Sequence, residues 1–231
     1  IKIRLLSFHL LLKDIYQPLF SLRMPMKEIK EDFLEKYSRQ ILIEKIGVKG
    51  QKKIFDSSVF ILGCGGLGTS AAQYLSMSGV GDLTLIDNDK VMLSNLNRQT
   101  LFTENDIGEN KAKVLSKRIK KINNFAKVSC IEKEISKKNI EKLINKNSIV
   151  LDCTDNFKTR FLINKFCHTH KKFLISAALQ NFDIQAFVLA SWKDKQNPCY
   201  ECIFQNSIKD SQNSCDEMGI VAPVAGLGGV S

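Results

Sequence analysis

Short apolar runs alternate with longer segments in which apolar residues recur at helical spacing, and this alternation continues through most of the chain. Glycine or polar residues bound the runs, as they bound buried strands. We expect strands at residues 59–62, 82–86, 128–131, 149–151, 173–177 and 183–189. We expect helices at residues 27–36, 69–77, 111–122, 137–144 and 158–170. Strands that alternate with helices predict an α/β fold with a doubly wound, largely parallel sheet.

A glycine-rich turn, GCGGLG, separates the first apolar run from the helical segment that follows it. Gly63, Gly65, Gly66 and Gly68 allow a tight turn and a close approach of the backbone to a ligand phosphate, and the next helix offers unpaired N–H groups. The second run ends at Asp87, about 20 residues later, where a nucleotide-binding βαβ unit places a carboxylate on the ribose. The pattern predicts a nucleotide site, and the competing interpretation is a glycine turn without a ligand.

Polar side chains crowd the segment that follows this carboxylate. Asp89, Asn95, Arg98 and Gln99 lie just past the predicted strand end, where open α/β sheets hold their ligands. Arg98 is the strongest candidate, because a guanidinium can bind two phosphate oxygens at once. The alternative is a solvated loop that caps Asp89.

Two further positions indicate a ligand site, and the first of them indicates an anionic ligand. Lys111 begins a predicted helix, where a cation is unfavourable unless an anion is nearby. Asp155 lies in the word DCTDN, at the end of the strand predicted at 149–151, where ligands bind. Asp155 or Thr154 could also cap the helix that follows.

Four words, GCGGLG, GVGDLTLIDNDKV, SNLNRQTLF and DCTDNFKTR, occur in this order and resemble the ThiF/MoeB/HesA family of E1-like enzymes. The resemblance covers residues 37–231 and implies a Rossmann-like nucleotide-binding fold of the E1/ThiF type. It also implies an adenylyltransferase, which uses ATP to adenylate the C-terminal glycine carboxylate of a ubiquitin-like sulfur-carrier protein ending in Gly-Gly. The products would be an acyl-adenylate and pyrophosphate, in molybdenum cofactor or thiamine biosynthesis.

The resemblance assigns roles to individual residues. It implies that the ATP phosphates lie among Asn95, Arg98, Gln99 and Lys111. Arg39 would reach the phosphates of the neighbouring subunit, which implies a homodimer. Asp155 would hold the Mg²⁺ ion that bridges the phosphates, as a hard cation bound by few carboxylates and substrate oxygens.

Cysteines add two expectations. Cys199 and Cys202 match the first CxxC of a structural zinc site in this family, but the second pair is absent and zinc normally takes four ligands. We therefore expect zinc in the full-length protein and a half-site here, with reduced structural thiols as the alternative. Cys215 matches a position at which some family members form a thioester or an acyl-disulfide, although Asp216 and Glu217 would raise its pKa.

Composition limits the class of protein. The chain has 231 residues, 44% of them apolar, and a formal net charge of +10. Residues 111–146 hold twelve Lys or Arg against three Glu, a basic face that could attract an acidic protein or nucleic acid, or could simply be solvated. No basic-aromatic motif accompanies it, so we predict no nucleic-acid binding. Residues 5–12 are apolar but too few to span a membrane, so we predict no membrane association.

Seven cysteines, an odd number without the spacing of a disulfide framework, indicate a reducing compartment, with the cytoplasm as the default. Cys130 and Cys153, at strand ends, are expected in the core. Residues 1–36 are expected to be an amino-terminal tail that is poorly ordered or not native. Residues 37–231 are expected to form the adenylation domain. In relatives with this pattern the domain continues past the position of Ser231, so we expect the domain to be truncated at its carboxyl end in this sequence.

Three rival functions stay open. An NAD-dependent oxidoreductase would use the glycine turn and Asp87, but it leaves Arg39, Arg98 and Lys111 without a purpose. A noncatalytic scaffold would bind a carrier-like partner without needing these cations. A third rival is a family member that adenylates a small or tRNA-linked carboxylate, and the CxxC pair argues weakly against it.

Overall fold

The computed structural model describes residues 30–144, 149–204 and 220–230. The chain divides into two compact units, Ile1–Ser38 and Arg39–Ser231. In the first unit, helix α2 (Glu31–Lys36) lies within the helix predicted at 27–36, of which residues 27–29 are outside the described part. Helix α3 (Ser38–Ile41) crosses the division, and the second unit contains the sheet.

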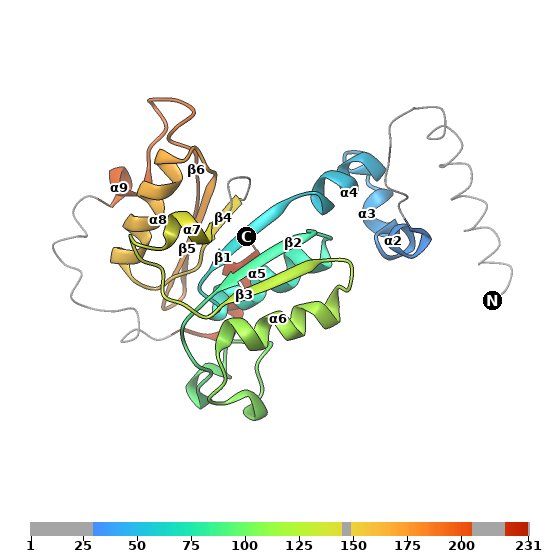
Figure 1. Ribbon diagram of the computed structural model, residues 1–231, viewed down its shortest axis with the longest axis horizontal. Helices are drawn as coiled ribbons and strands as arrows, with labels where there is room; N and C mark the ends of the chain where they lie inside the picture. Colours follow the sequence, from blue (N-terminus) through green and yellow to red (C-terminus); the bar gives the residue numbers. More distant parts are fainter. Residues whose placement is uncertain (1–29, 145–148, 205–219, 231) are drawn as a thin grey trace, which may run out of the picture. The chain divides into compact units, whose positions relative to one another are not determined.

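Six strands form one sheet in the order β3-β2-β1-β4-β5-β6 (Figure 1). The strands are β1 (Ser58–Leu62), β2 (Asp82–Ile86), β3 (Lys127–Ile131), β4 (Ile149–Asp152), β5 (Leu174–Gln180) and β6 (Asp183–Leu189). Strands β1 to β5 pair in parallel, and β6 pairs antiparallel with β5. The chain moves from β1 outward to β2 and β3, then returns to place β4 on the other side of β1. The strand order therefore reverses between β1 and β4, the position at which open α/β sheets bind ligands.

Helices cover both faces of the sheet. The helices that follow α3 are α4 (Gly47–Phe55), which leads into β1, α5 (Gly66–Met77), α6 (Lys111–Ile122), α7 (Ile140–Leu143), α8 (Phe157–Thr169), α9 (Tyr200–Ile203) and α11 (Ala222–Val230), with 3₁₀ turns η2 (Leu93–Asn95) and η3 (Glu104–Asp106). The predicted α/β class with a doubly wound, largely parallel sheet is confirmed.

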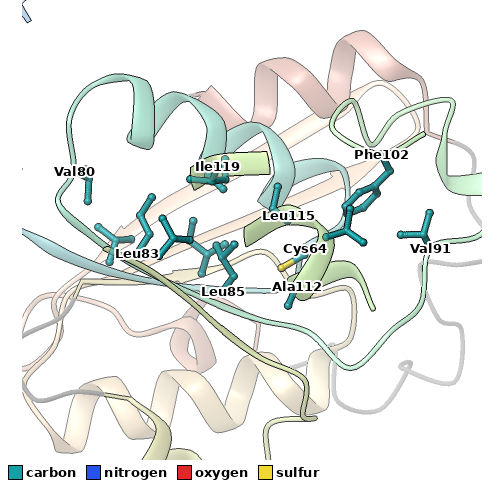
Figure 2. Close-up of a cluster of buried hydrophobic side chains, with 14 residues drawn as sticks. Cys64, Val80, Leu83, Leu85, Val91, Phe102, Ala112, Leu115 and Ile119 are labelled. Carbon is teal, nitrogen blue, oxygen red and sulfur yellow. The ribbon is translucent and has the colours of Figure 1, made fainter. Parts of the chain in front are cut away.

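Neighbouring residues of one strand enter different cores, because side chains alternate across a sheet. Val59 and Ile61 pack with α5 and α6 on one face, in the cluster that Figure 2 shows. Phe60 and Leu62 pack with α7, α8 and α9 on the opposite face. A smaller cluster joins α11 to α5 and β5. The two-sided burial explains why β1 reads as a continuous apolar run rather than as an alternating one.

Among the helices whose predicted range is fully described, two begin three residues away from the predicted start, and α8 is shifted by one residue. Helix α5 begins at Gly66, within the glycine turn, rather than after it. Helix α7 covers only Ile140–Leu143 of the segment predicted at 137–144. Asn139 explains the late start, since its side chain accepts a hydrogen bond from the Ser136 backbone N–H (2.8 Å) and donates to the Glu134 carbonyl (2.8 Å). These bonds favour a turn over a helix.

The expectation that Cys130 lies in the core is wrong. Its side chain is exposed, although Val128, two residues earlier on the same face of the edge strand β3, is buried. Cys153 is partly buried and packs against two of the three hydrophobic clusters. Within residues 30–144, 149–204 and 220–230, no helix has the length and apolarity needed to cross a membrane.

Candidate functional site

A cavity of about 910 Å³ opens at the carboxyl ends of the parallel strands, where the strand order reverses. Its wall includes the glycine turn and most of the site residues predicted from the sequence: Gly63, Gly65, Gly66, Asp87, Asp89, Asn95, Arg98, Gln99, Lys111 and Asp155. Leu62, Ile86 and Ile135 add apolar surface, as a site for a nucleoside requires. The volume suits a ligand of nucleotide size.

Two glycines of the turn are needed for different reasons. Gly63 has φ +91°, and a Cβ there would lie 2.6 Å from the Cys153 carbonyl oxygen at the end of β4. Gly68 lies in the first turn of α5, where a Cβ would be 1.9 Å from the Gly63 carbonyl oxygen. The first glycine allows the turn, and the second lets the helix approach it. The unpaired N–H groups of α5 consequently begin at the cavity wall.

The Asp87 carboxylate is held in place at the end of β2. Its Oδ2 accepts a hydrogen bond from the Cys64 N–H (2.7 Å), and its Oδ1 accepts one from the Asp89 N–H (2.8 Å). Burial raises the pKa of Asp87 above its ordinary value, while these two backbone hydrogen bonds and the Lys111 charge oppose the rise. The carboxylate lines the cavity at the position from which it could accept hydrogen bonds from ribose hydroxyls.

Lys111 meets an anion at the start of α6. Its side chain is only 7% exposed, and Nζ lies 3.0 Å from Oδ2 of Asp89, whose side chain is 57% exposed. The Asn110 side chain caps the same helix by accepting a hydrogen bond from the Lys113 N–H (3.0 Å). The conflict between a cation and a helix N-terminus, noted in the sequence, is therefore relieved by Asp89. A bound phosphate could replace this carboxylate as the partner of Lys111.

The segment between β2 and α6 presents the remaining predicted phosphate ligands. The Asn95 side chain accepts a hydrogen bond from the Met92 N–H (3.0 Å), which shapes the turn η2. One Arg98 nitrogen, Nη1, donates to the Ser94 carbonyl (2.8 Å), and the guanidinium borders the cavity.

Gln99 is 2% exposed and lines the cavity. Among the described residues, its Oε1 is buried and has no hydrogen-bond partner. A buried acceptor without a partner costs about 1–3 kcal/mol. A ligand hydroxyl or amino group, or an ordered water, would satisfy it.

Asp106 fastens this segment to α6. Its carboxylate accepts hydrogen bonds from the Thr103 N–H (2.8 Å), the Thr103 hydroxyl (2.8 Å) and the Arg118 guanidinium (3.0 Å). Burial alone would raise the pKa of Asp106, but the bonds from Thr103 and Arg118 outweigh it and lower the pKa below its ordinary value.

Asp155 lies at the exposed rim of the cavity, in the loop after β4. The helix that follows is capped by Asn156, which accepts a hydrogen bond from the Thr159 N–H (2.9 Å), so the capping role suggested for Asp155 or Thr154 is wrong. Thr154 instead donates its hydroxyl to the buried Asp152 (2.6 Å). The Asp155 carboxylate can therefore turn toward a ligand.

The residues at this rim suit a Mg²⁺ ion that is bound together with substrate phosphates, rather than a metal ion held by protein side chains alone. Within the part of the chain that the structure describes, no three His, Cys, Asp or Glu side chains gather as metal ligands. Mg²⁺ commonly binds through one or two carboxylates together with substrate phosphates and water. Asp155 provides one such carboxylate.

The cysteine in the cavity wall is not a candidate nucleophile. Burial, and secondarily the charge of Asp152, raises the pKa of Cys153 to about 12, so the thiolate is scarce at neutral pH. Cys199 and Cys202 lie apart from the cavity wall, with their sulfurs 3.4 Å apart. This separation is close to the roughly 3.8 Å that two thiolates span on a tetrahedral zinc ion. The pair thus fits half of a zinc site.

Besides Gly68, Cys199 and Cys202, two more predicted site residues are not placed in this cavity. Arg39 is exposed on α3 and is not part of the cavity wall. Cys215 lies outside the described residues.

Sequence reasoning assigned no role to Arg160, which is buried and lines the cavity from α8. The sequence did contain a signal for it, since Arg160 is a cation one turn into the helix that follows the Asp155 loop.

Comparisons with known proteins agree with this geometry. A family model described as the ThiF family matches residues 37–231. The sulfur carrier protein ThiS adenylyltransferase of Escherichia coli (strain K12) is 40% identical over 199 residues, which is 86% of this chain and 77% of the relative. The adenylyltransferase and sulfurtransferase MOCS3 of Drosophila persimilis is 37% identical over 204 residues, 88% of this chain but only 45% of the relative.

The solved structure of E. coli MccB with ATP has a TM-score of 0.70 and 26% identity, over 92% of this chain and 70% of that one. Both curated relatives are named adenylyltransferases, in agreement with the activity predicted from the sequence. Because the family model covers all but the amino-terminal residues, the predicted family is confirmed, and the chain belongs to the ThiF family.

Proposed function

We propose that this chain binds ATP in the cavity and adenylates the C-terminal glycine carboxylate of a ubiquitin-like sulfur-carrier protein. One observation carries the proposal: the glycine turn, the Asp87 carboxylate and two cations, Arg98 and Lys111, line a single cavity. The names of the relatives support the same activity.

ATP would lie with its ribose hydroxyls on Asp87 and its phosphates against the glycine turn and the first N–H groups of α5. Arg98 would bind phosphate oxygens from the adjoining segment. Lys111 would exchange Asp89 for a phosphate oxygen, which keeps its buried charge paired throughout. Gln99 would accept a hydrogen bond from the ligand through its unpartnered Oε1.

The carrier carboxylate would attack the α-phosphorus of ATP. A bond forms between a carboxylate oxygen and that phosphorus, while the bond from the phosphorus to the bridging oxygen of pyrophosphate breaks and pyrophosphate leaves with that electron pair. A glycine carboxylate is ionised at neutral pH, so the step transfers no proton and needs no general base. The residues of the cavity therefore act by positioning the reactants and neutralising charge.

Asp155 would hold Mg²⁺ at the rim. The ion, when bound, would neutralise charge on the phosphates and on the leaving pyrophosphate. The Asp155 carboxylate is exposed beside the cavity and does not cap α8, so it is available to bind the ion.

The proposal extends to three further features: a homodimer, a zinc site and a covalent intermediate. Arg39, exposed on α3, would complete the phosphate site of a second copy in a homodimer. Cys199 and Cys202 would supply two of the four ligands of a structural zinc site. Cys215 would attack the carbonyl carbon of the acyl-adenylate as the thiolate, so that a thioester bond to the carrier forms while the bond to AMP breaks and AMP leaves.

The experiment that tests the function is ATP–pyrophosphate exchange by the full-length protein. It is run with carrier proteins ending in Gly-Gly from the thiamine and the molybdenum cofactor pathways, and without a carrier. We expect exchange with at least one carrier and its loss in Arg98→Ala. If nucleotide binds but neither carrier supports exchange, the carrier assignment is wrong, and small carboxylates and tRNA become the substrates to test. Tight NAD binding without ATP binding would overturn the adenylation proposal itself.

A further inference from the structure

The CxxC segment is connected to the proposed magnesium loop through two buried side chains. Tyr200 lies between Cys199 and Cys202, and its side chain is buried. Its hydroxyl accepts a hydrogen bond from Nη1 of Arg160 at 3.4 Å. The other terminal nitrogen of Arg160, Nη2, donates to the carbonyl of Thr154. The residue after Thr154 is Asp155, the carboxylate proposed to hold Mg²⁺.

A guanidinium is suited to this position. Its two terminal nitrogens are fixed in one plane, so it can hold two acceptors in a constant relation to each other. Arg160 is 5% exposed, which makes the loss of either acceptor costly, because a buried charge needs hydrogen-bond partners. The Thr154 carbonyl, which precedes Asp155, is therefore hydrogen-bonded to the rigid Arg160 guanidinium rather than to water.

Tyr200 is itself fixed by its surroundings. Its backbone N–H donates to the Asn164 side chain of α8 at 2.9 Å. Its ring packs against Phe161, with ring centroids 5.7 Å apart, and against Phe204, at 4.6 Å. The hydroxyl therefore has little freedom to follow Arg160, and the position of α9 limits the position of the guanidinium.

We propose that Arg160 and Tyr200 are positioning residues that hold the Asp155 loop in the geometry required for Mg²⁺, so that the CxxC segment supports the phosphate site through Tyr200. This inference rests on the proposed binding of ATP with Mg²⁺ in the cavity. It assigns the CxxC segment a role in nucleotide binding that is separate from the binding of zinc by its sulfurs. Neither residue touches the reacting atoms in this scheme.

Tyr200→Phe is the matched variant, because it removes one hydroxyl and keeps the ring in the aromatic cluster. ATP binding to the full-length protein is measured calorimetrically, first in EDTA and then at rising Mg²⁺. We expect the Mg²⁺ concentration for half-maximal enhancement of ATP binding to rise about three- to tenfold, as the loss of one net hydrogen bond predicts. ATP affinity in EDTA should change less than twofold. Arg160→Lys, which keeps the charge but loses the planar fork, should raise the Mg²⁺ requirement at least as far.

Two comparisons separate positioning from general damage. Tyr74→Phe, at an exposed tyrosine of α5 outside the cavity wall, should leave both measurements unchanged. In an Asp155→Asn background, Tyr200→Phe should have no further effect, because the residue through which it acts is already altered. An equal effect in both backgrounds would overturn the proposal, as would an equal loss of binding with and without Mg²⁺.

The outcomes also separate this inference from the proposed function. If wild-type protein binds ATP with a clear Mg²⁺ requirement that Tyr200→Phe does not change, the positioning role is refuted and the function stands. If wild-type protein does not bind ATP at all, both are refuted.

Discussion

Alanine at Gly68 should impair both things that the glycine turn does, folding and nucleotide binding. The Cβ of an alanine at this position would lie 1.9 Å from the carbonyl oxygen of Gly63 and 2.9 Å from its carbonyl carbon. Both atoms belong to the backbone, so no rotamer change can relieve the overlap. The N-terminus of α5 would have to move away from the turn by about 1 Å or more to restore van der Waals contact.

The magnitude follows from two opposing effects. Overpacking in a close-packed region costs about 1–3 kcal/mol, and a clash with fixed backbone belongs at the upper end. Alanine in a helix recovers about 0.5–1 kcal/mol relative to glycine. The net expectation is a loss of about 2 kcal/mol in the free energy of unfolding, or roughly 4–8 °C in Tm for a chain of this size.

Gly226→Ala is the matched control. Gly226 lies inside α11, and a Cβ there would meet nothing within 4 Å, so the same substitution should stabilise by about 0.5–1 kcal/mol. Urea unfolding and calorimetric ATP binding are measured for both variants. We expect ATP binding to weaken at least tenfold in Gly68→Ala, because the N–H groups at the start of α5 move. The reasoning is refuted if Gly68→Ala is as stable as Gly226→Ala and binds ATP like the wild type.

Three further variants test individual residues of the site. Asp106→Asn should lower stability by about 1–2 kcal/mol at pH 7. Because the folded state lowers the pKa of Asp106, this contribution is present above the ordinary carboxyl pKa and disappears as pH falls through the lowered value, so urea unfolding at pH 7 and pH 3 should show the difference shrinking. Gln99→Met should leave the free energy of unfolding equal or higher, since it removes a buried acceptor that has no partner among the described residues, yet calorimetry should show weaker ATP binding. Lys111→Met should reduce ATP–pyrophosphate exchange at least tenfold, because a charge-assisted bond to phosphate contributes about 1.5–3 kcal/mol, and unchanged exchange would exclude Lys111 from the phosphate site.

Much of this fold could be predicted because its signals are local. The run at 82–86 and the helix at 111–122 were predicted with the bounds that β2 and α6 have. In each case the signal lies in a few consecutive residues: an apolar run that ends at Asp87, or a segment of helical spacing that begins at Lys111. The predicted cluster of polar residues past β2 also follows from topology, since parallel strands place their carboxyl ends on one edge.

The errors arose where a neighbour in sequence or in the sheet decided the outcome. Asp155, Thr154 and Asn156 are all good helix caps by residue type, and only the position of the Thr159 N–H determines that Asn156 serves. Cys130 follows the alternation of a buried strand, but its burial depends on what packs against that part of the sheet face, where Val128 is covered and Cys130 is not. Propensity and periodicity carry no information on either point.

The interactions that distinguish the site are the least local ones. Arg160 and Tyr200 are 40 residues apart in the chain, and each taken alone has an ordinary explanation as a helix cation or a core aromatic. Their significance comes from the Thr154 carbonyl, which the same guanidinium binds. Likewise, Lys111 conflicts with its own helix until Asp89, on a different segment, is placed beside it. Some residues violate a local rule and are then paired with a distant residue at a cavity wall. Such a residue is a better indicator of function than one that satisfies its local pattern. The reason is that the pairing preserves a buried charge, which folding alone would disfavour.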